Sequence, residues 1–308
     1  MITHLRRWAV LAVAALCLQP AGAASTAPAT FATPNDAAKA LVDAAAAYNV
    51  PRLLQIFGPN AKELFESADP VRDKQNAAEF VKKAREKLTI RDDSATQATI
   101  VVGDDAWPLP VPIVKANGRW SFDSTDGERE VLLRRIGANE LDAIQVCRGY
   151  VAAQRTYSLQ RHNGVNQYAQ RIFSTPGKHD GLYWQNEDGT HGGPIAKPVA
   201  NALSEGYSVG KGGFHGYYYK ILTGQGPDAP LGKMNYVIEG VMIGGFGLVA
   251  VPAEYRVTGV KTFIVSNSGI VYEKDLGPNS LSIAKEMSLY NPDSTWQPTN
   301  AAWPGNTV

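Results

Sequence analysis

The chain has 308 residues, and its 30 lysines and arginines nearly balance its 29 aspartates and glutamates. A near-neutral chain lacks the basic surface that binding to nucleic acid or anionic lipid requires, so we expect neither partner. With only two cysteines, stability must come from hydrophobic cores rather than from a disulfide framework, and the length favours two domains.

Residues 1–23 are typical of an export signal. Arg6 and Arg7 precede an apolar run of 11 residues from Trp8 to Leu18, and the small residues Ala21-Gly22-Ala23 follow. A helix needs about 20 residues to cross the hydrocarbon core, so the run is too short for a membrane anchor. We expect cleavage after Ala23, no membrane span in the mature form and a periplasmic or secreted location, with general secretion or twin-arginine export as the route.

After a flexible linker at residues 24–33, a first domain is expected at residues 34–124. Thr33-Pro34-Asn35-Asp36 is a helix-capping sequence, and a second short helix begins near Leu53. A third helix is expected from Asp73 to Leu88, with its apolar residues on one side.

Strands follow these helices. One strand is expected at Gln97–Gly103, and Ile113–Ala116 pairs with Arg119–Phe122 across the turn dipeptide Asn117-Gly118. Between them, prolines at every second position lack amide donors on one side of an extended chain, which predicts a sheet edge: Pro108, Pro110 and Pro112. Helices followed by such a sheet resemble the nuclear-transport-factor-2-like, or cystatin-like, cone fold, which implies a pocket between helix and sheet.

The second domain, residues 125–308, begins with a long helix from Asp126 to about Leu159. Its apolar stripe consists of Val131, Leu132, Ile136, Leu141, Ile144, Cys147 and Val151. Cys147 on this stripe is expected to be a buried, unreactive thiol. A loop-rich insertion at residues 160–233 precedes four predicted strands, at Met234–Ile243, Phe246–Val251, Val260–Ser266 and Ile270–Asp275. The expected fold class is therefore α+β, with two domains.

Two further resemblances concern longer stretches. The mature chain resembles the bacterial domain-of-unknown-function family 2950 through long motifs: Trp107-Pro108-Leu109-Pro110, Arg134-Arg135-Ile136-Gly137-Ala138-Asn139-Glu140-Leu141, Ala153-Gln154-Arg155-Thr156-Tyr157, Gly245-Phe246, Tyr272-Glu273-Lys274-Asp275-Leu276-Gly277 and Asn291-Pro292-Asp293. The family implies no chemistry.

The second half also resembles the globular heads of type IV pilin-like proteins. The shared residues are Asn139-Glu140, Ala153-Gln154, Tyr157, Val251-Pro252, Tyr255, Gly259-Val260, Phe263 and Gly269-Ile270. This resemblance implies a helix packed across an antiparallel sheet. The apolar filament stem of that family is replaced here by charged residues: Glu128, Arg129, Glu130, Arg134 and Arg135.

A serine hydrolase is one catalytic alternative. Gly206-Tyr207-Ser208-Val209-Gly210 matches the nucleophile-elbow pattern, with His215 or His191 as the base. The glycine-rich residues that follow Ser208 do not favour the required helix, and no acid lies between Ser208 and His215. A flexible glycine loop is therefore the simpler interpretation.

Other candidate residues have structural explanations beside functional ones. His179, Asp180 and His191 are a weak metal set without helical ligand spacing. The remaining candidates for ligand or partner binding are aromatic or charged: Trp184, Tyr217, Tyr219, Arg134, Arg135, Asn139 and Glu140. Core packing of the aromatic residues and a solvated helix face are the alternatives.

These observations favour an exported, non-catalytic binding or assembly module without a cofactor. Its expected partner is an envelope protein or a small ligand. The periplasmic serine hydrolase using Ser208 remains the alternative.

Overall fold

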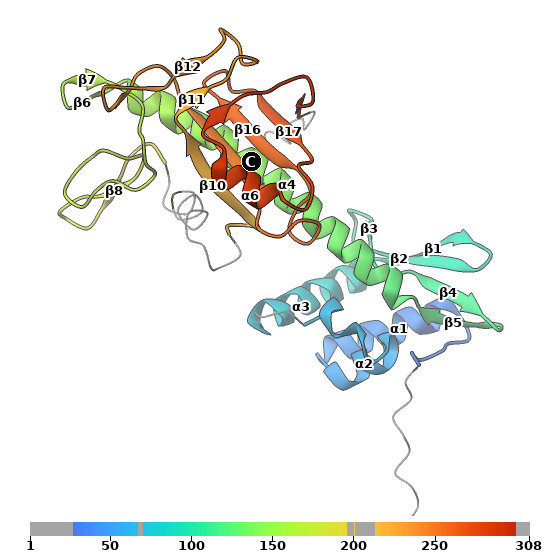
Figure 1. Cartoon of the computed structure of the whole chain (residues 1–308). Coiled ribbons are helices and arrows are strands. Elements are labelled where there is room, and N and C mark those ends of the chain that lie inside the picture. Colours follow the sequence, from blue (N-terminus) through green and yellow to red (C-terminus); the bar gives the residue numbers. More distant parts are fainter. Residues whose placement is uncertain (1–26, 67–69, 196–199, 201–212, 300–308) are drawn as a thin grey trace, which may run out of the picture. The chain divides into compact units, whose positions relative to one another are not determined.

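A computed structural model describes residues 27–66, 70–195, 200 and 213–299, and it has a mixed α+β fold (Figure 1), as the sequence predicts. The described residues form two compact units that divide between Glu128 and Arg129. This division lies close to the boundary expected between residues 124 and 125. No helix in the described ranges is long and apolar enough to cross a membrane.

Unit 1 begins with helices that start where the sequence places capping residues. Helix α1 spans Pro34–Ala46, and Thr33 Oγ1 accepts a hydrogen bond from Asp36 N (3.2 Å) while Asp36 Oδ2 accepts one from Thr33 N (3.1 Å). Helix α2 spans Val50–Phe57, followed by the 3-10 helix η1 at Ala61–Leu64. The capping prediction at Thr33 is thereby confirmed. Helix α2 begins three residues before the expected Leu53, because the side chain of Asn49 caps it.

The third helix, α3, spans Pro70–Glu86 and ends before the expected Leu88. Leu88 instead begins strand β1, Leu88–Ser94, which was not predicted. Leu88 and Ile90 alternate with the exposed Thr89 and Arg91, but the second half, Asp92-Asp93-Ser94, is polar and exposed, so the alternation that marks a half-buried strand is short. Antiparallel pairing with the next strand, β2 at Gln97–Val102, holds β1 in its extended conformation.

The sheet of unit 1 is antiparallel, in the order β1-β2-β4-β5, with β3 at Trp107–Pro108 paired to β2. Strands β4, Ile113–Ala116, and β5, Arg119–Phe122, form the expected hairpin, whose turn residues have positive φ values of 51° at Asn117 and 76° at Gly118. The helices and this sheet share one core; its fully buried side chains include Ile56, Ile100, Ile113 and Phe122.

Unit 2 is built around an antiparallel sheet and the helix α4, Ser124–Ser158, whose first turns belong to unit 1. The strands, in the order β10-β15-β16-β17-β19, are Tyr217–Leu222, Gly247–Pro252, Thr262–Ser266, Val271–Lys274 and Gln297–Pro298. The main core joins α4 to this sheet; its members include Ile144, Cys147, Tyr150, Val151, Tyr219, Leu248, Ala250 and Phe263.

Three residues of the expected helical stripe are outside the core: Val131 and Leu132 are half-buried, and Leu141 is exposed. Leu141 is 49% exposed, whereas Cys147 is fully buried, as expected. The two are six residues apart, which at 3.6 residues per turn places them about 120° apart around the helix axis. Leu141 therefore does not belong to the buried face of the helix, although the sequence analysis placed it there.

The strand expected at Met234–Ile243 is wrong, because the chain reverses within it. Strands β12, Met234–Asn235, β13, Val237–Ile238, and β14, Val241–Met242, replace it. The turn between β13 and β14 is formed by Glu239 (φ 50°) and Gly240 (φ 81°). The later strands and the Asn267-Ser268-Gly269 turn lie within a few residues of their expected positions.

The remaining elements were not predicted. Two short hairpins lie in the expected insertion: β6, Arg161–His162, with β7, Val165–Asn166, and β8, Trp184–Gln185, with β9, His191–Gly192. A small sheet in the order β12-β11-β18 includes β11, Gly224–Gln225, and β18, Leu289–Tyr290. Helix α6 spans Ser280–Glu286, and a second core lies between it and the main sheet.

Candidate functional site

The turn from Gly226 to Gly232 is closed by one buried side chain. Gln225 is 3% exposed, and its Nε2 donates hydrogen bonds to Pro230 O (2.6 Å) and Gly232 O (2.7 Å). Its Oε1 accepts a hydrogen bond from Tyr236 Oη at 3.0 Å. Both amide hydrogens of Gln225 are thus committed to carbonyls on either side of Leu231, so the turn has one defined geometry.

Leu231 is held in an unfavourable backbone conformation. Its φ is +74°, in the left-handed region, where a non-glycine residue costs about 1–2 kcal/mol. Its side chain is 94% exposed, so burial of the leucine within the described structure does not offset this cost. Strain of this kind persists only where the surrounding structure imposes it, as the Gln225 amide does here.

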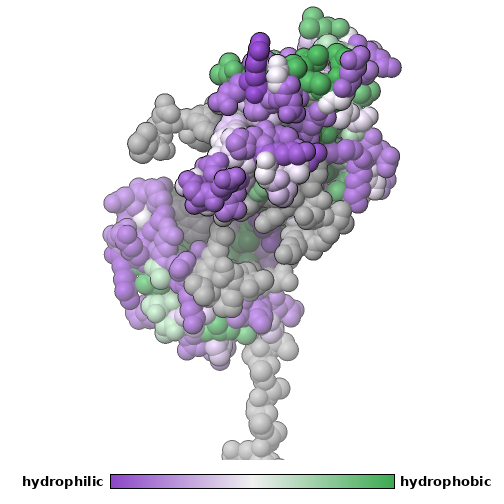
Figure 2. Space-filling model, turned by 90° about the vertical axis from the view of Figure 1, so that its left-hand side faces the viewer, coloured by the Kyte–Doolittle hydropathy of each residue, from purple (hydrophilic) through white to green (hydrophobic). Residues whose placement is uncertain are grey.

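Leu231 is not the sole aliphatic side chain displayed by this segment. Ile238 and Ile243 are each 46% exposed, and we call Leu231, Ile238 and Ile243 the 231–243 patch. Figure 2 shows hydrophobic surface gathered at the top of the view, the end at which Figure 1 places β12. An exposed hydrophobic surface is typical of an interaction site.

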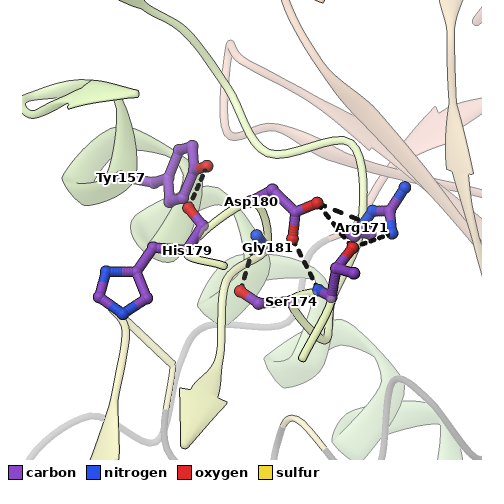
Figure 3. A network of polar contacts seen from close by, with 7 residues as sticks. Tyr157, Arg171, Ser174, His179, Asp180 and Gly181 are labelled. Carbon is purple, nitrogen blue, oxygen red and sulfur yellow. Dashed lines mark hydrogen bonds and ion pairs between the residues drawn. The ribbon is translucent and has the colours of Figure 1, made fainter. Parts of the chain in front are cut away.

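A second loop, residues 171–181, is closed by polar contacts (Figure 3). Asp180 accepts hydrogen bonds from Thr175 N (2.7 Å) and Thr175 Oγ1 (2.8 Å), and its Oδ2 lies 3.8 Å from Arg171 Nη1. Burial acts to raise the pKa of Asp180, but the Thr175 hydrogen bonds and the Arg171 charge together bring that pKa below its usual value. Asp180 is therefore an ionised clamp for this loop.

The expected metal set does not assemble. Figure 3 shows the imidazole of His179 directed away from the Asp180 network, and its ring stacks on Trp184 with centroids 4.4 Å apart. His191 Nδ1 lies 2.5 Å from Tyr183 Oη. In the described ranges no three His, Cys, Asp or Glu side chains form a group that could hold a metal ion. These residues instead pack the loop and the β8–β9 hairpin, where the Trp184 ring also lies against Gly192.

The charged residues expected on α4 have different surroundings. Glu140 Oε1 accepts hydrogen bonds from Val260 N (2.9 Å) and Lys261 N (3.0 Å), and Asn139 Nδ2 donates to Thr258 O (2.9 Å). These two side chains bind the segment before β16 to α4. A third, Arg134, makes an ion pair of 2.9 Å with Glu130, and Arg135 is exposed.

Tyr217 and Tyr219 do not form a surface platform. Their side chains are 0% and 2% exposed, because alternate residues of β10 point into the core beneath α4. Burial raises the pKa of both hydroxyls far above the usual value. Tyr217 Oη donates to Lys261 O (2.8 Å). Both tyrosines are therefore core residues, which was the alternative to a binding platform in the sequence analysis.

His215 has a carboxylate partner that sequence reasoning missed. Its Nδ1 contacts Oδ2 of Asp142, a residue of α4 that precedes it by 73 positions. No spacing motif connects residues so far apart, so only the packing of β10 on α4 brings them together. Ser208, the nucleophile of the hydrolase alternative, lies outside the described residues.

Comparison with known proteins identifies the chain only at the level of a family. A family model described as "Protein of unknown function (DUF2950)" matches residues 28–299. No curated protein matches the chain. No solved structure matches it either, so the cone-like and pilin-head-like resemblances stay predictions. The match spans nearly all of the sequence, and the chain belongs to the DUF2950 family.

Proposed function

We propose that this protein is exported and binds a protein partner through Leu231. The observation that carries the proposal is a fully displayed leucine in a left-handed conformation, fixed by the buried amide of Gln225. Glycine would occupy φ +74° without strain. A leucine there costs stability and contributes an apolar contact surface.

The geometry of the turn favours a protein over a small molecule. Small ligands bind in concave sites, whereas Leu231 protrudes, so its receptor must itself provide an apolar pocket. Pro227 and Pro230 restrict the backbone of the turn, and Gln225 fixes its carbonyls. A surface that is already ordered loses little conformational entropy on binding, which favours affinity.

Export is supported by the sequence of residues 1–23, which lie outside the described residues. The basic start, short apolar run and small-residue site predict a mature chain that begins at Ala24. N-terminal sequencing of protein released by osmotic shock tests this directly. Retention of Met1 would contradict export, and the partner would then be sought in the cytoplasm.

Site-specific photo-crosslinking tests the binding surface. A photoreactive phenylalanine analogue is placed at Leu231 in the exported protein, and at Arg256 as the matched control. Arg256 is exposed in the same unit and also has a positive φ, of 62°, but it is not part of the 231–243 patch. We expect one discrete adduct from position 231 and none from position 256.

Competition makes the outcome decisive. Excess purified wild-type protein should abolish the adduct, whereas excess Leu231→Gly protein should not. Adducts of equal yield at positions 231 and 256, or equal competition by both proteins, would contradict the proposal. An adduct whose mass equals twice that of the chain would identify a second copy as the occupant and overturn the assignment of a different protein.

A further inference from the structure

His215 is fixed on a tight turn at the start of β10. Its backbone has φ +46°, between Gly213 at +69° and Gly216 at +75°. Phe214 and Tyr217 exchange two backbone hydrogen bonds of 3.0 Å across this turn, and the Phe214 ring stacks on the imidazole with centroids 4.0 Å apart. The backbone hydrogen bonds of the turn and the stacked Phe214 ring therefore both restrict the position of the imidazole.

The turn approaches α4 closely because residue 216 is glycine. A Cβ added to Gly216 would lie 2.6 Å from Thr258 Cβ and 2.8 Å from Asn139 Nδ2, closer than real contacts allow. This close approach brings His215 Nδ1 to the carboxylate of Asp142. The Asp142–His215 contact is thus built by the packing of the turn on α4.

The contact determines which nitrogen of the imidazole carries the proton. An ionised carboxylate only accepts hydrogen bonds, so Nδ1 of His215 is the donor, and in the neutral imidazole Nε2 is the nitrogen with the lone pair. The His215 side chain is 48% exposed, so solvent and small molecules reach the ring. A carboxylate on Nδ1 fixes the orientation of the imidazole ring.

The other described histidines lack this arrangement. His191 Nδ1 meets the neutral hydroxyl of Tyr183, and His162 Nε2 meets the carbonyl of Tyr157. His179 stacks on Trp184. In the part of the chain that the structure describes, His215 alone is paired with a carboxylate.

A buried polar group completes the surroundings of the pair. Tyr219 lies on β10 two residues beyond Tyr217, its side chain is 2% exposed, and its Oη has no hydrogen-bond partner within the described structure. Burial raises the pKa of this hydroxyl, and the nearby Asp142 carboxylate adds to the effect. The phenol therefore stays neutral.

We propose that Asp142 and His215 form an acid–base pair that promotes the attack of water on a small ester. Nε2 of His215 takes one proton from the water as its oxygen bonds to the acyl carbon. The ester C–O bond then breaks, and the departing alkoxide takes the proton from Nε2, so ester and water give acid and alcohol. His215 is the catalytic residue and Asp142 the positioning residue. This activity goes beyond partner binding and does not depend on it.

The test uses p-nitrophenyl acetate and the mature full-length protein. We expect hydrolysis at least about 100-fold faster than that caused by an equal concentration of free N-acetylhistidine, and loss of this excess in His215→Gln. His191→Gln is the matched control and should retain the wild-type rate. A rate equal to that of N-acetylhistidine, or full activity in His215→Gln, would overturn the proposal.

To show that Asp142 positions His215, and does not merely stabilise the fold, we measure the tautomer of His215 as well as the rate of hydrolysis. In Asp142→Asn we expect hydrolysis to fall about tenfold or more. Nitrogen NMR should show the His215 Nδ1–H form in the wild type and a change of tautomer in the variant, with circular dichroism unchanged. An unchanged tautomer and rate in a folded Asp142→Asn variant would overturn the positioning role. Leu231→Gly should keep full hydrolysis, which separates this activity from the proposed partner binding.

Discussion

The 226–232 turn and the 171–181 loop of unit 2 are both closed by one polar side chain, yet they display different surfaces. Gln225 is buried and fixes two carbonyls around Leu231, whereas Asp180 is partly exposed and fixes Thr175 beside Arg171. The hydrogen bonds and the ion pair of Asp180 are sufficient to explain the conformation of the 171–181 loop. The hydrogen bonds of Gln225 explain the backbone conformation of the 226–232 turn. They do not explain why a leucine, rather than a glycine, occupies the strained position 231. That difference is the reason why we propose the turn, and not the loop, as a binding surface.

The largest effect should come from the core that supports both regions. Cys147 is fully buried, and burial raises the pKa of its thiol to about 12, so it stays neutral. Cys147→Asp would place an unpaired carboxylate there and should cost about 3–5 kcal/mol in the free energy of unfolding. Urea unfolding should show this loss, and amide exchange should become fast in both the turn and the loop.

The controls for this variant are Cys147→Ala and Cys147→Ser, which should be far milder. A thiol reagent should label Cys147 slowly in the native protein and fully in the denatured protein. Tolerance of the aspartate, or fast native labelling, would show that this face of α4 is not in the core.

The next effect concerns the clamp of the turn. Gln225→Leu removes hydrogen bonds to Pro230 O and Gly232 O and leaves Tyr236 Oη without its acceptor. We expect a loss of about 2–4 kcal/mol in the free energy of unfolding. Amide exchange should accelerate in residues 226–232 while residues 171–181 keep their protection. Equal acceleration in both segments would mean that the two regions are not independent.

A smaller effect is expected at the other clamp, where pH provides the test. The pKa of Asp180 is lowered in the folded state, so its stabilising contribution is present above about pH 4, the unfolded value, and is lost as pH falls through the folded value. Asp180→Ala should cost about 1 kcal/mol at neutral pH and remove part of the acid sensitivity of unfolding. A variant with undiminished acid sensitivity would contradict the ionised clamp. Glu187→Ala, in the neighbouring β8–β9 hairpin, is the control for the loss of one exposed carboxylate.

The sequence predicted features that depend on local rules. The Thr33 and Asp36 capping box, the Asn117-Gly118 hairpin and the burial of Cys147 follow from residue type and spacing, and all are present. Strand β1 was missed because only its first four residues alternate, while its polar second half is extended through pairing with β2.

The candidate site was less predictable because its contacts join distant parts of the chain. Asp142 meets His215 across 73 positions, and no spacing rule indicates that contact. Leu231 offered no sequence signal either, since its φ of +74° would be expected of a glycine. Its exposure became informative only once the buried position of Gln225 was known.

The most direct test of partner binding is Leu231→Gly, measured for stability and for binding in the same preparation. Glycine relieves the left-handed strain, so the free energy of unfolding should rise by about 1 kcal/mol, while the photo-crosslinked complex should no longer be competed by this variant. Arg256→Gly, at φ 62°, should give a similar gain in stability and compete like the wild type. A more stable Leu231→Gly protein that still competes fully would contradict the assignment of Leu231 to a partner.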